Sequence, residues 1–118
     1  MKKILIIDDD QSIREFFKDE LEEDGYAVAL AATGQEGLER LDADPAGFHL
    51  VMLDIKMPGM GGLEVLSRIK EMRRDLPVIL VSAYDTYKMD FSSWAAEDYI
   101  IKSSDIRELK EKIRRYIS

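Results

Sequence analysis

Acidic side chains directly follow two short apolar runs in this chain of 118 residues. Asp8 and Asp9 come after the run 4–7, and Asp54 comes after the run 50–53. In an open parallel sheet the carboxyl ends of neighbouring strands meet at one crevice, where these carboxylates would raise one another's pKa. A bound cation would relieve that repulsion. Mg²⁺ is the natural candidate, because it prefers oxygen ligands and is often held by one or two carboxylates beside a phosphate.

Two more polar residues follow apolar runs and could reach the same crevice. Ser82 comes after the run 78–81, and Lys102 comes after the run 99–101. A carboxylate, a metal ion, a cation and a hydroxyl together are typical of a phosphoryl-transfer site. Asp54 stands alone at the end of its strand, so it is the predicted nucleophile and would form an aspartyl phosphate. Lys102 would neutralise charge on the phosphoryl oxygens, and Ser82 would donate a hydrogen bond to one of them.

The elements that must position these residues alternate between strand and helix along the chain. The predicted strands are 4–7, 26–31, 48–53, 77–81 and 99–101. The predicted helices are 11–24, 34–42, 63–72 and 104–117, and the segment 84–97 reads as a short helix or an irregular loop. Right-handed crossovers then predict an α/β, flavodoxin-like, doubly wound five-stranded parallel sheet. Its order is 2-1-3-4-5, with helices on both faces and a crevice between the first and third strands.

Residue spacing also predicts which helical residues face the core and where the helices begin and end. The expected inward residues are Ile13, Phe16, Phe17 and Leu21 in the first helix, and Leu63, Leu66 and Ile69 in the helix 63–72. The expected caps are Asp10, Thr33 and Ser104 at helix starts and Gly25 at a helix end. Asp10 is therefore interpreted as a solvated helix-start residue rather than a metal ligand.

Composition indicates one domain, residues 1–118, with no output domain. Hydrophobic residues make up 46% of the chain, which is enough for a single core without disulfides, and there is no cysteine. The first apolar run ends after four residues, and no run approaches the roughly 20 residues of a membrane helix. A net charge of −7 argues against direct nucleic-acid binding. We therefore expect a cytoplasmic protein that contacts neither membrane nor nucleic acid.

The motifs taken together resemble the receiver domain of two-component response regulators over residues 2–117. They are the stretches 3–10 (KILIIDDD), 50–60 (LVMLDIKMPGM), 81–83 (VSA) and 98–102 (DYIIK). The resemblance implies a bacterial, CheY-like phosphorelay protein. Such a protein accepts a phosphoryl group from a sensor histidine kinase or a histidine phosphotransfer protein. It is not an enzyme, beyond catalysing its own phosphorylation and dephosphorylation.

The resemblance also implies a role for each matching residue. The phosphoacceptor is Asp54, the Mg²⁺ ligands are Asp8, Asp9, Asp54 and the backbone carbonyl of Lys56, and the switch residues are Ser82, Lys102 and Tyr99. Phosphorylation is expected to draw Ser82 and Lys102 to the phosphate and let Tyr99 turn inward. The face made by the fourth helix (84–97), the fifth strand and the last helix would then change. An unknown downstream protein would read that face, and the chain could dimerise through it.

Two departures from the family pattern set this chain apart. The segment between Ser82 and Lys102 is shorter than usual and carries aromatic residues, which predicts an atypical short fourth helix. This segment is either a specialised docking surface or a rebuilt connector packed by its aromatic residues. Ser103 stands where the family usually has a proline after a cis bond, and a cis bond before another residue costs about 3 kcal/mol. We expect either a trans bond with Lys102 displaced or a cis bond held by the site.

Lys56 and Tyr84 lie two residues after Asp54 and Ser82, positions that flank the path of attacking water in the resembling family. A long cation and a bulky ring there would shield the phosphate from water. We therefore expect an aspartyl phosphate that hydrolyses slowly.

Two alternatives from other functional classes fit less well. A phosphohydrolase with an aspartate nucleophile usually has an acid two residues after the nucleophile, and residue 56 is Lys. A non-phosphorylated pseudo-receiver that only docks partners would lack the acid pair or the lysine, and both are present. The chain could be a stand-alone regulator or a receiver cut from a longer protein. Met1 and the lack of linker residues favour the stand-alone regulator.

Overall fold

The computed structural model describes residues 1–55, 59–83, 96–102 and 105–117. One five-stranded parallel sheet has the order β2-β1-β3-β4-β5, which confirms the predicted topology. The strands are β1 (Lys3–Ile7), β2 (Ala27–Ala31), β3 (Leu50–Asp54), β4 (Val78–Ser82) and β5 (Asp98–Ile101). The helices in this part of the chain are α1 (Gln11–Glu23), α2 (Gly34–Ala43), α3 (Gly62–Met72) and α4 (Ile106–Ile117). The short helix predicted within 84–97 falls almost wholly outside the described residues and stays a prediction.

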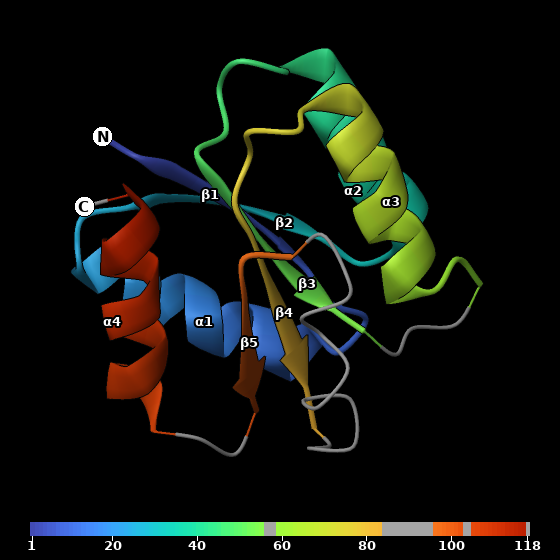
Figure 1. The fold of residues 1–118 in the computed structure, drawn as a ribbon. Coiled ribbons are helices and arrows are strands. Elements are labelled where there is room, and N and C mark those ends of the chain that lie inside the picture. The colour runs from blue at the N-terminus through green and yellow to red at the C-terminus, as the bar shows by residue number, and fades with distance from the viewer. Residues whose placement is uncertain (56–58, 84–95, 103–104, 118) are drawn as a thin grey trace.

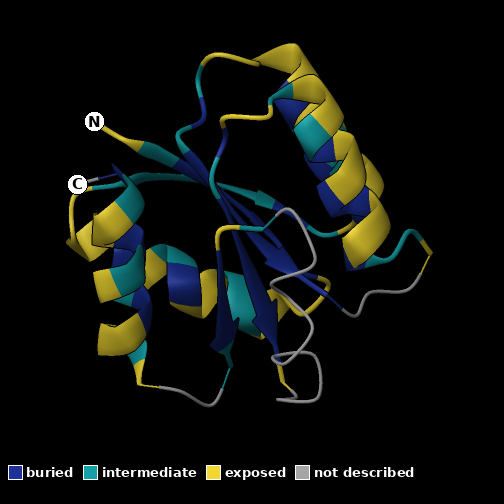
Figure 2. Cartoon of the chain, in the orientation of Figure 1, coloured by how far each residue is buried: buried dark blue, intermediate teal, exposed yellow. Residues whose placement is uncertain are grey.

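Helices cover both faces of the sheet (Figure 1), with α1 and α4 on one side and α2 and α3 on the other. The strand residues alternate between the two layers. Leu5 and Ile7 of β1 pack in the core layer that includes α2 and α3, whereas Ile4 and Ile6 pack in the layer that includes α1 and α4. Figure 2 shows the central strands as buried along their length. This double cover explains why the strands read as nearly continuous apolar runs.

Most of the predicted helix ends are confirmed. The Asp10 carboxylate accepts hydrogen bonds from two backbone N–H groups of α1, at 2.9 and 3.3 Å. The Thr33 hydroxyl accepts one from the first turn of α2 at 3.0 Å. Gly25 ends α1 with φ +92°, a conformation that favours glycine. Asp105 accepts a hydrogen bond of 2.9 Å in the first turn of α4, while the predicted cap, Ser104, lies outside the described residues.

Two residues predicted to face the core are exposed instead. Phe16 is 48% exposed and Leu63 is 41% exposed. Each lies at the margin of an apolar stripe, and spacing of three or four residues does not distinguish the margin from the centre. Val65 of α3 is fully buried, although it was not among the residues predicted to face the core.

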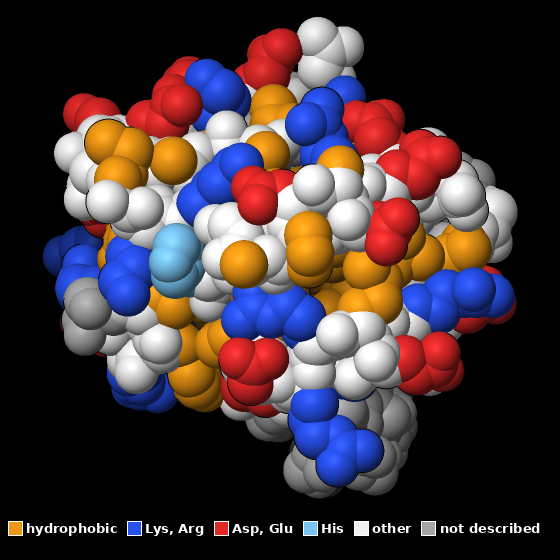
Figure 3. All heavy atoms as spheres, turned by 90° about the horizontal axis from the view of Figure 1, so that it is seen from above, with side chains coloured by type: hydrophobic (Ala, Val, Ile, Leu, Met, Phe, Trp, Pro, Cys, Tyr) orange, Lys and Arg blue, Asp and Glu red, His pale blue; other side chains and the backbone are white. Residues whose placement is uncertain are grey.

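The surface seen from above Figure 1 carries charges of both signs. Figure 3 shows Lys and Arg side chains interspersed with Asp and Glu, with apolar groups between them. Ion pairs between such side chains include that of Lys70 with Glu97, at 2.9 Å. Such a mixed face differs from the clustered basic surface that holds a phosphate backbone. In addition, none of the helices in the described ranges has the length and apolar character needed to cross a bilayer.

Asp98 joins the start of β5 to α4. Its Oδ1 accepts hydrogen bonds of 2.8 Å from the Lys112 ammonium and from the backbone N–H of Tyr99, and the Tyr116 hydroxyl donates to its Oδ2 at 3.2 Å. Burial by itself would raise the pKa of Asp98. The hydrogen bonds outweigh burial, that from Lys112 most of all, and hold the pKa below its usual value.

Replacing Asp98 by Asn should lower the free energy of unfolding at pH 7 by about 2 kcal/mol, because a charged hydrogen-bonding partner is lost. The pKa of Asp98 is lower in the folded chain than in the unfolded chain, so its stabilisation is present above about pH 4 and is lost as the pH falls further. Urea unfolding of both proteins should therefore show a difference that shrinks in acid. A difference that stays the same from neutral pH to about pH 3 would contradict this assignment.

Candidate functional site

The sheet register brings the polar strand ends together. Ile7 at the end of β1 pairs with Leu53 of β3, so the residues that follow, Asp8 and Asp54, lie side by side. On the other side of β3, Asp54 pairs with Val81 of β4. β5 then places Lys102 one residue beyond the pair formed by Ser82 and Ile101. Four of the five strands, β1, β3, β4 and β5, thus bring polar residues to one carboxyl edge, as the sequence pattern indicates.

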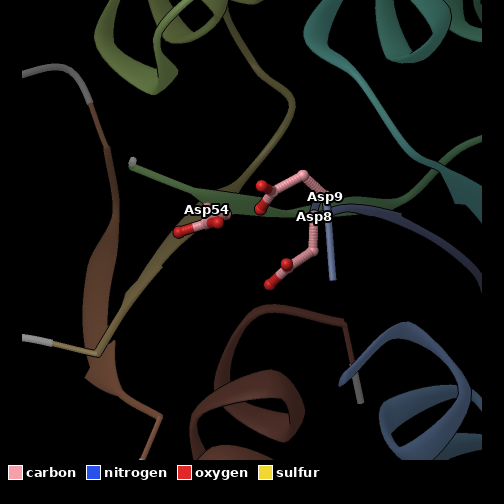
Figure 4. Close-up of side chains that lie close together, drawn as sticks. All are labelled: Asp8, Asp9 and Asp54. Carbon is pink, nitrogen blue, oxygen red and sulfur yellow. The ribbon is translucent and has the colours of Figure 1, made fainter. Parts of the chain in front are cut away.

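Three carboxylates converge at this edge. Figure 4 shows the side chains of Asp8 and Asp9 from the end of β1 close to that of Asp54 from β3. One oxygen from each of the three lies within 4.8 Å of the others. Asp8 is 2% exposed and Asp54 is 4% exposed, whereas Asp9 reaches solvent. The crevice therefore combines two buried carboxylates with one at its rim.

Lys102 bridges the two buried carboxylates. Its Nζ lies 2.9 Å from Asp8 Oδ2 and 3.4 Å from Asp54 Oδ2. Burial would lower the pKa of the Lys102 ammonium, but the hydrogen bond to Asp8 and the charges of Asp54 and Asp8 outweigh burial and raise the pKa. Lys102 is therefore positively charged throughout the neutral range.

Hydrogen bonds from α1 and from its N-cap residue hold Asp8 in place. The backbone N–H of Asp10 donates to Asp8 Oδ1 at 2.9 Å, which leaves Oδ2 directed to Lys102. Arg14 Nη1 donates to the backbone carbonyl of Asp8 at 2.7 Å. Arg14 is not among the site residues predicted from the sequence. A basic residue in the second turn of a helix that follows the acid pair is the only available signal, and surface lysines and arginines share it.

Ser82 lies at the end of β4, and Tyr99 lies in β5, the strand that Lys102 follows. Ser82 is 1% exposed at the end of β4, and its carbonyl accepts a hydrogen bond of 2.7 Å from the backbone N–H of Lys102. Tyr99 is 2% exposed and packs in the core layer that includes α2 and α3. The predictions made for Lys56 and Tyr84 and for the bond between Lys102 and Ser103 concern positions outside the described residues.

The donor set suits a divalent metal ion. By formal charge, the three carboxylates and the Lys102 ammonium leave two negative charges among these side chains. Hard oxygen donors are the ligands that Mg²⁺ and Ca²⁺ prefer, and the exposed Asp9 leaves the group open to water on one side. The residues Asp8, Asp9 and Asp54 thus form a candidate site for a divalent cation.

A family model described as the response regulator receiver domain matches residues 4–114. The chain belongs to this family. The receiver domain is 40% identical over 113 residues to YkoG of Bacillus subtilis, an uncharacterized transcriptional regulatory protein, covering 94% of this chain and 49% of the relative. It is 36% identical over 115 residues to the response regulator ArlR of Staphylococcus saprophyticus, covering 97% and 51%. The chain thus spans about half the length of these curated relatives.

Solved structures agree with the family assignment. The receiver domain is similar to the response regulator TrrA of Thermotoga maritima, solved with Mg²⁺ and BeF, at 44% identity and a TM-score of 0.91. That match covers 99% of this chain and 100% of the other. It is also similar to a chain in the crystal structure of the histidine kinase ThkA in complex with TrrA, at 45% identity and a TM-score of 0.89. That match covers 100% of this chain and 100% of the other. The resemblance predicted from the motifs is therefore confirmed.

Proposed function

We propose that this receiver domain accepts a phosphoryl group on Asp54 from a phosphohistidine, on a sensor histidine kinase or a histidine phosphotransfer protein. The observation that carries this proposal is the arrangement at the end of β3. The Asp54 carboxylate is buried at the end of β3, between β1 and β4, 3.4 Å from the Lys102 ammonium and next to two further carboxylates. The complex of TrrA with a histidine kinase supports the same class of partner for this chain.

The chemical step is an in-line displacement at phosphorus. A carboxylate oxygen of Asp54 forms the new O–P bond as the P–N bond of the phosphohistidine breaks, and the electron pair of that bond returns to the imidazole nitrogen. Lys102 stabilises negative charge on the phosphoryl oxygens, and Ser82 donates a hydrogen bond to one of them. Asp54 has to be ionised for this attack. The Lys102 ammonium lies 3.4 Å from this carboxylate and places a positive charge beside it.

The proposed cofactor is Mg²⁺, held by Asp8, Asp9, Asp54 and the backbone carbonyl of Lys56. When bound, Mg²⁺ supplies positive charge beside the phosphoryl oxygens. The chain's own contribution is to hold Asp8 in place, through the backbone N–H of Asp10 and through Lys102. Without these contacts the ligand carboxylate could rotate away from the crevice.

Phosphorylation is proposed to switch a protein-interaction face. Ser82 and Lys102 would move toward the phosphate, and Tyr99 would change rotamer at the centre of β5. The proposed face comprises β5, α4 and the segment 84–97. We propose that an unknown downstream protein in the cytoplasm reads it, and that the chain can dimerise through it. In this proposal the domain binds neither membrane nor nucleic acid and has no enzymatic activity beyond its own phosphorylation and dephosphorylation.

The proposed function is tested by the intact mass of the protein after incubation with acetyl phosphate. A gain of one phosphoryl group that depends on Mg²⁺ and disappears in EDTA is expected. Phosphoryl transfer from a phosphorylated histidine phosphotransfer protein provides the second arm. No gain from either donor would contradict the proposal and favour a docking module that works without phosphorylation.

We also predict slow hydrolysis of the aspartyl phosphate, from the sequence positions of Lys56 and Tyr84. Replacing Lys56 by Asn or Tyr84 by Ala should speed the loss of phosphate by about tenfold, because water would reach phosphorus more easily. Phosphorylated protein is freed of donor, and its mass is followed in buffer with Mg²⁺. Fast loss from the wild type that neither substitution changes would show that these side chains do not shield the phosphate.

A further inference from the structure

The helix α3 begins directly against the backbone that carries Asp54. Gly62, its first residue, is buried, and its backbone N–H donates a hydrogen bond of 2.9 Å to the carbonyl of Ile55. A Cβ atom at position 62 would lie 2.5 Å from the Asp54 carbonyl oxygen, 2.5 Å from Ile55 Cα and 2.7 Å from the Ile55 carbonyl oxygen. All three are backbone atoms, so a rotamer change cannot relieve the overlap.

Both sides of this contact are anchored. On the strand side, the backbone N–H of Ile55 donates to the Val81 carbonyl at 3.1 Å, which ties the end of β3 to β4. On the helix side, α3 is held in the core by Val65, Leu66 and Ile69, which are each at most 4% exposed. A side chain at position 62 would therefore have to displace either a packed helix or the peptide between Asp54 and Ile55. We expect the peptide to be displaced rather than the helix, because the peptide lies at a strand end. Any displacement of this peptide also moves the carboxylate of Asp54.

We propose that Gly62 is a positioning residue for phosphoryl transfer. The absence of a side chain lets α3 start against the peptide that follows Asp54, and this contact sets how far the Asp54 carboxylate projects into the crevice. Gly62 acts through Asp54, because its backbone N–H is hydrogen-bonded to the carbonyl of Ile55, the residue that follows Asp54. This role presupposes the phosphoryl transfer proposed above.

The chain supplies two controls for this test. At Gly61, one residue earlier, an added Cβ meets nothing within 4 Å, so Gly61→Ala adds the same methyl group without the overlap. At Gly34 in α2, an added Cβ would overlap the side chain of Val65, which packs α3 in the core, without meeting the peptide that follows Asp54. Gly34→Ala therefore reports what pressure on α3 alone costs the fold and the site, with no overlap at the peptide that follows Asp54.

The experiment compares wild type, Gly61→Ala, Gly62→Ala and Gly34→Ala in two assays. The first is the rate of phosphorylation by acetyl phosphate with Mg²⁺, followed by intact mass. The second is the affinity for beryllofluoride with Mg²⁺, followed by the ¹⁹F NMR signal of the bound form. All proteins are kept cold in about 1 M trimethylamine N-oxide, an excluded solute that favours the folded state, and rates are divided by the folded fraction from circular dichroism.

Gly62→Ala is expected to lose about tenfold to a hundredfold in both assays, because a displacement of the nucleophile of about 1 Å has effects of that size. Gly61→Ala and Gly34→Ala should stay within about twofold of the wild type per folded molecule. A Gly62→Ala protein that matches the two controls would overturn the inference. So would one that stays unfolded where Gly34→Ala folds, because residue 62 would then serve the fold as a whole. A wild type that takes up no phosphoryl group at all contradicts the proposed function instead.

Discussion

Replacing Asp54 by Asn should lower the rate of phosphorylation by acetyl phosphate by about three orders of magnitude or more, which is the usual cost of removing a nucleophile. Asn has nearly the same shape but offers no carboxylate to attack phosphorus. The crevice itself should survive the change, since Asp8 keeps its hydrogen bonds to Asp10 and Lys102. Intact mass measured against time, with EDTA in a parallel sample, gives the rate.

Asp10→Asn is the matched control for this prediction. Asp10 lies close to the site in sequence, but its carboxylate is exposed and accepts hydrogen bonds from Ser12 and Ile13 at the start of α1. Because Asn caps helices about as well as Asp, Asp10→Asn should change the rate by no more than about twofold. A comparable loss in both variants, or a phosphorylated Asp54→Asn protein, would place the phosphoacceptor elsewhere.

Replacing Lys102 by Met should lower the free energy of unfolding in EDTA by about 3 kcal/mol at pH 7, because two buried carboxylates lose their shared counter-charge. The pKa of Lys102 is raised in the folded protein, so its contribution is complete below about pH 10.5 and is lost only as the pH rises through the raised value. The deficit of the variant should therefore persist across the neutral range. Phosphorylation of Lys102→Met should also slow by about a hundredfold.

Saturating Mg²⁺ should reduce the deficit of Lys102→Met in urea unfolding, because a cation bound by the folded state replaces part of the lost charge. Lys110→Met is the control. Lys110 is as buried as Lys102, yet its ion pairs with Glu20 and Asp24 lie at 3.6 and 3.4 Å on the surface between α1 and α4. Its loss should cost less than about 1 kcal/mol and be insensitive to Mg²⁺. Equal deficits in the two variants, with or without Mg²⁺, would show that Lys102 does not balance the crevice.

The predicted topology was correct because it depends on features that are local in sequence. Runs such as 4–7 and 50–53 indicate strands buried on both faces, and the alternation of strands with helices leaves few right-handed arrangements. Once the order is known, the acids at the ends of β1 and β3 must be neighbours. The same holds for caps such as Asp10 and Thr33, whose hydrogen bonds span two or three residues.

The predicted inward faces were correct only in part. The spacing of Phe16 and Leu63 fits an inward position, yet both are largely exposed. Whether such a residue is covered depends on how the helix is rotated against the sheet and on what packs beside it, and neither is encoded in the spacing along one helix.

The chain by itself determined the family, the sheet order and the identity of the crevice residues Asp8, Asp9, Asp54 and Lys102, because residue type and strand-end position are both written in the sequence. Only the tertiary structure decided the contacts among them. It placed one ammonium between two carboxylates, added Arg14 behind Asp8, and set α3 so close to the end of β3 that Gly62 has no room for a side chain. Such distances depend on how whole helices pack on the sheet. The position of one backbone segment there is set by many side chains that come from distant parts of the chain.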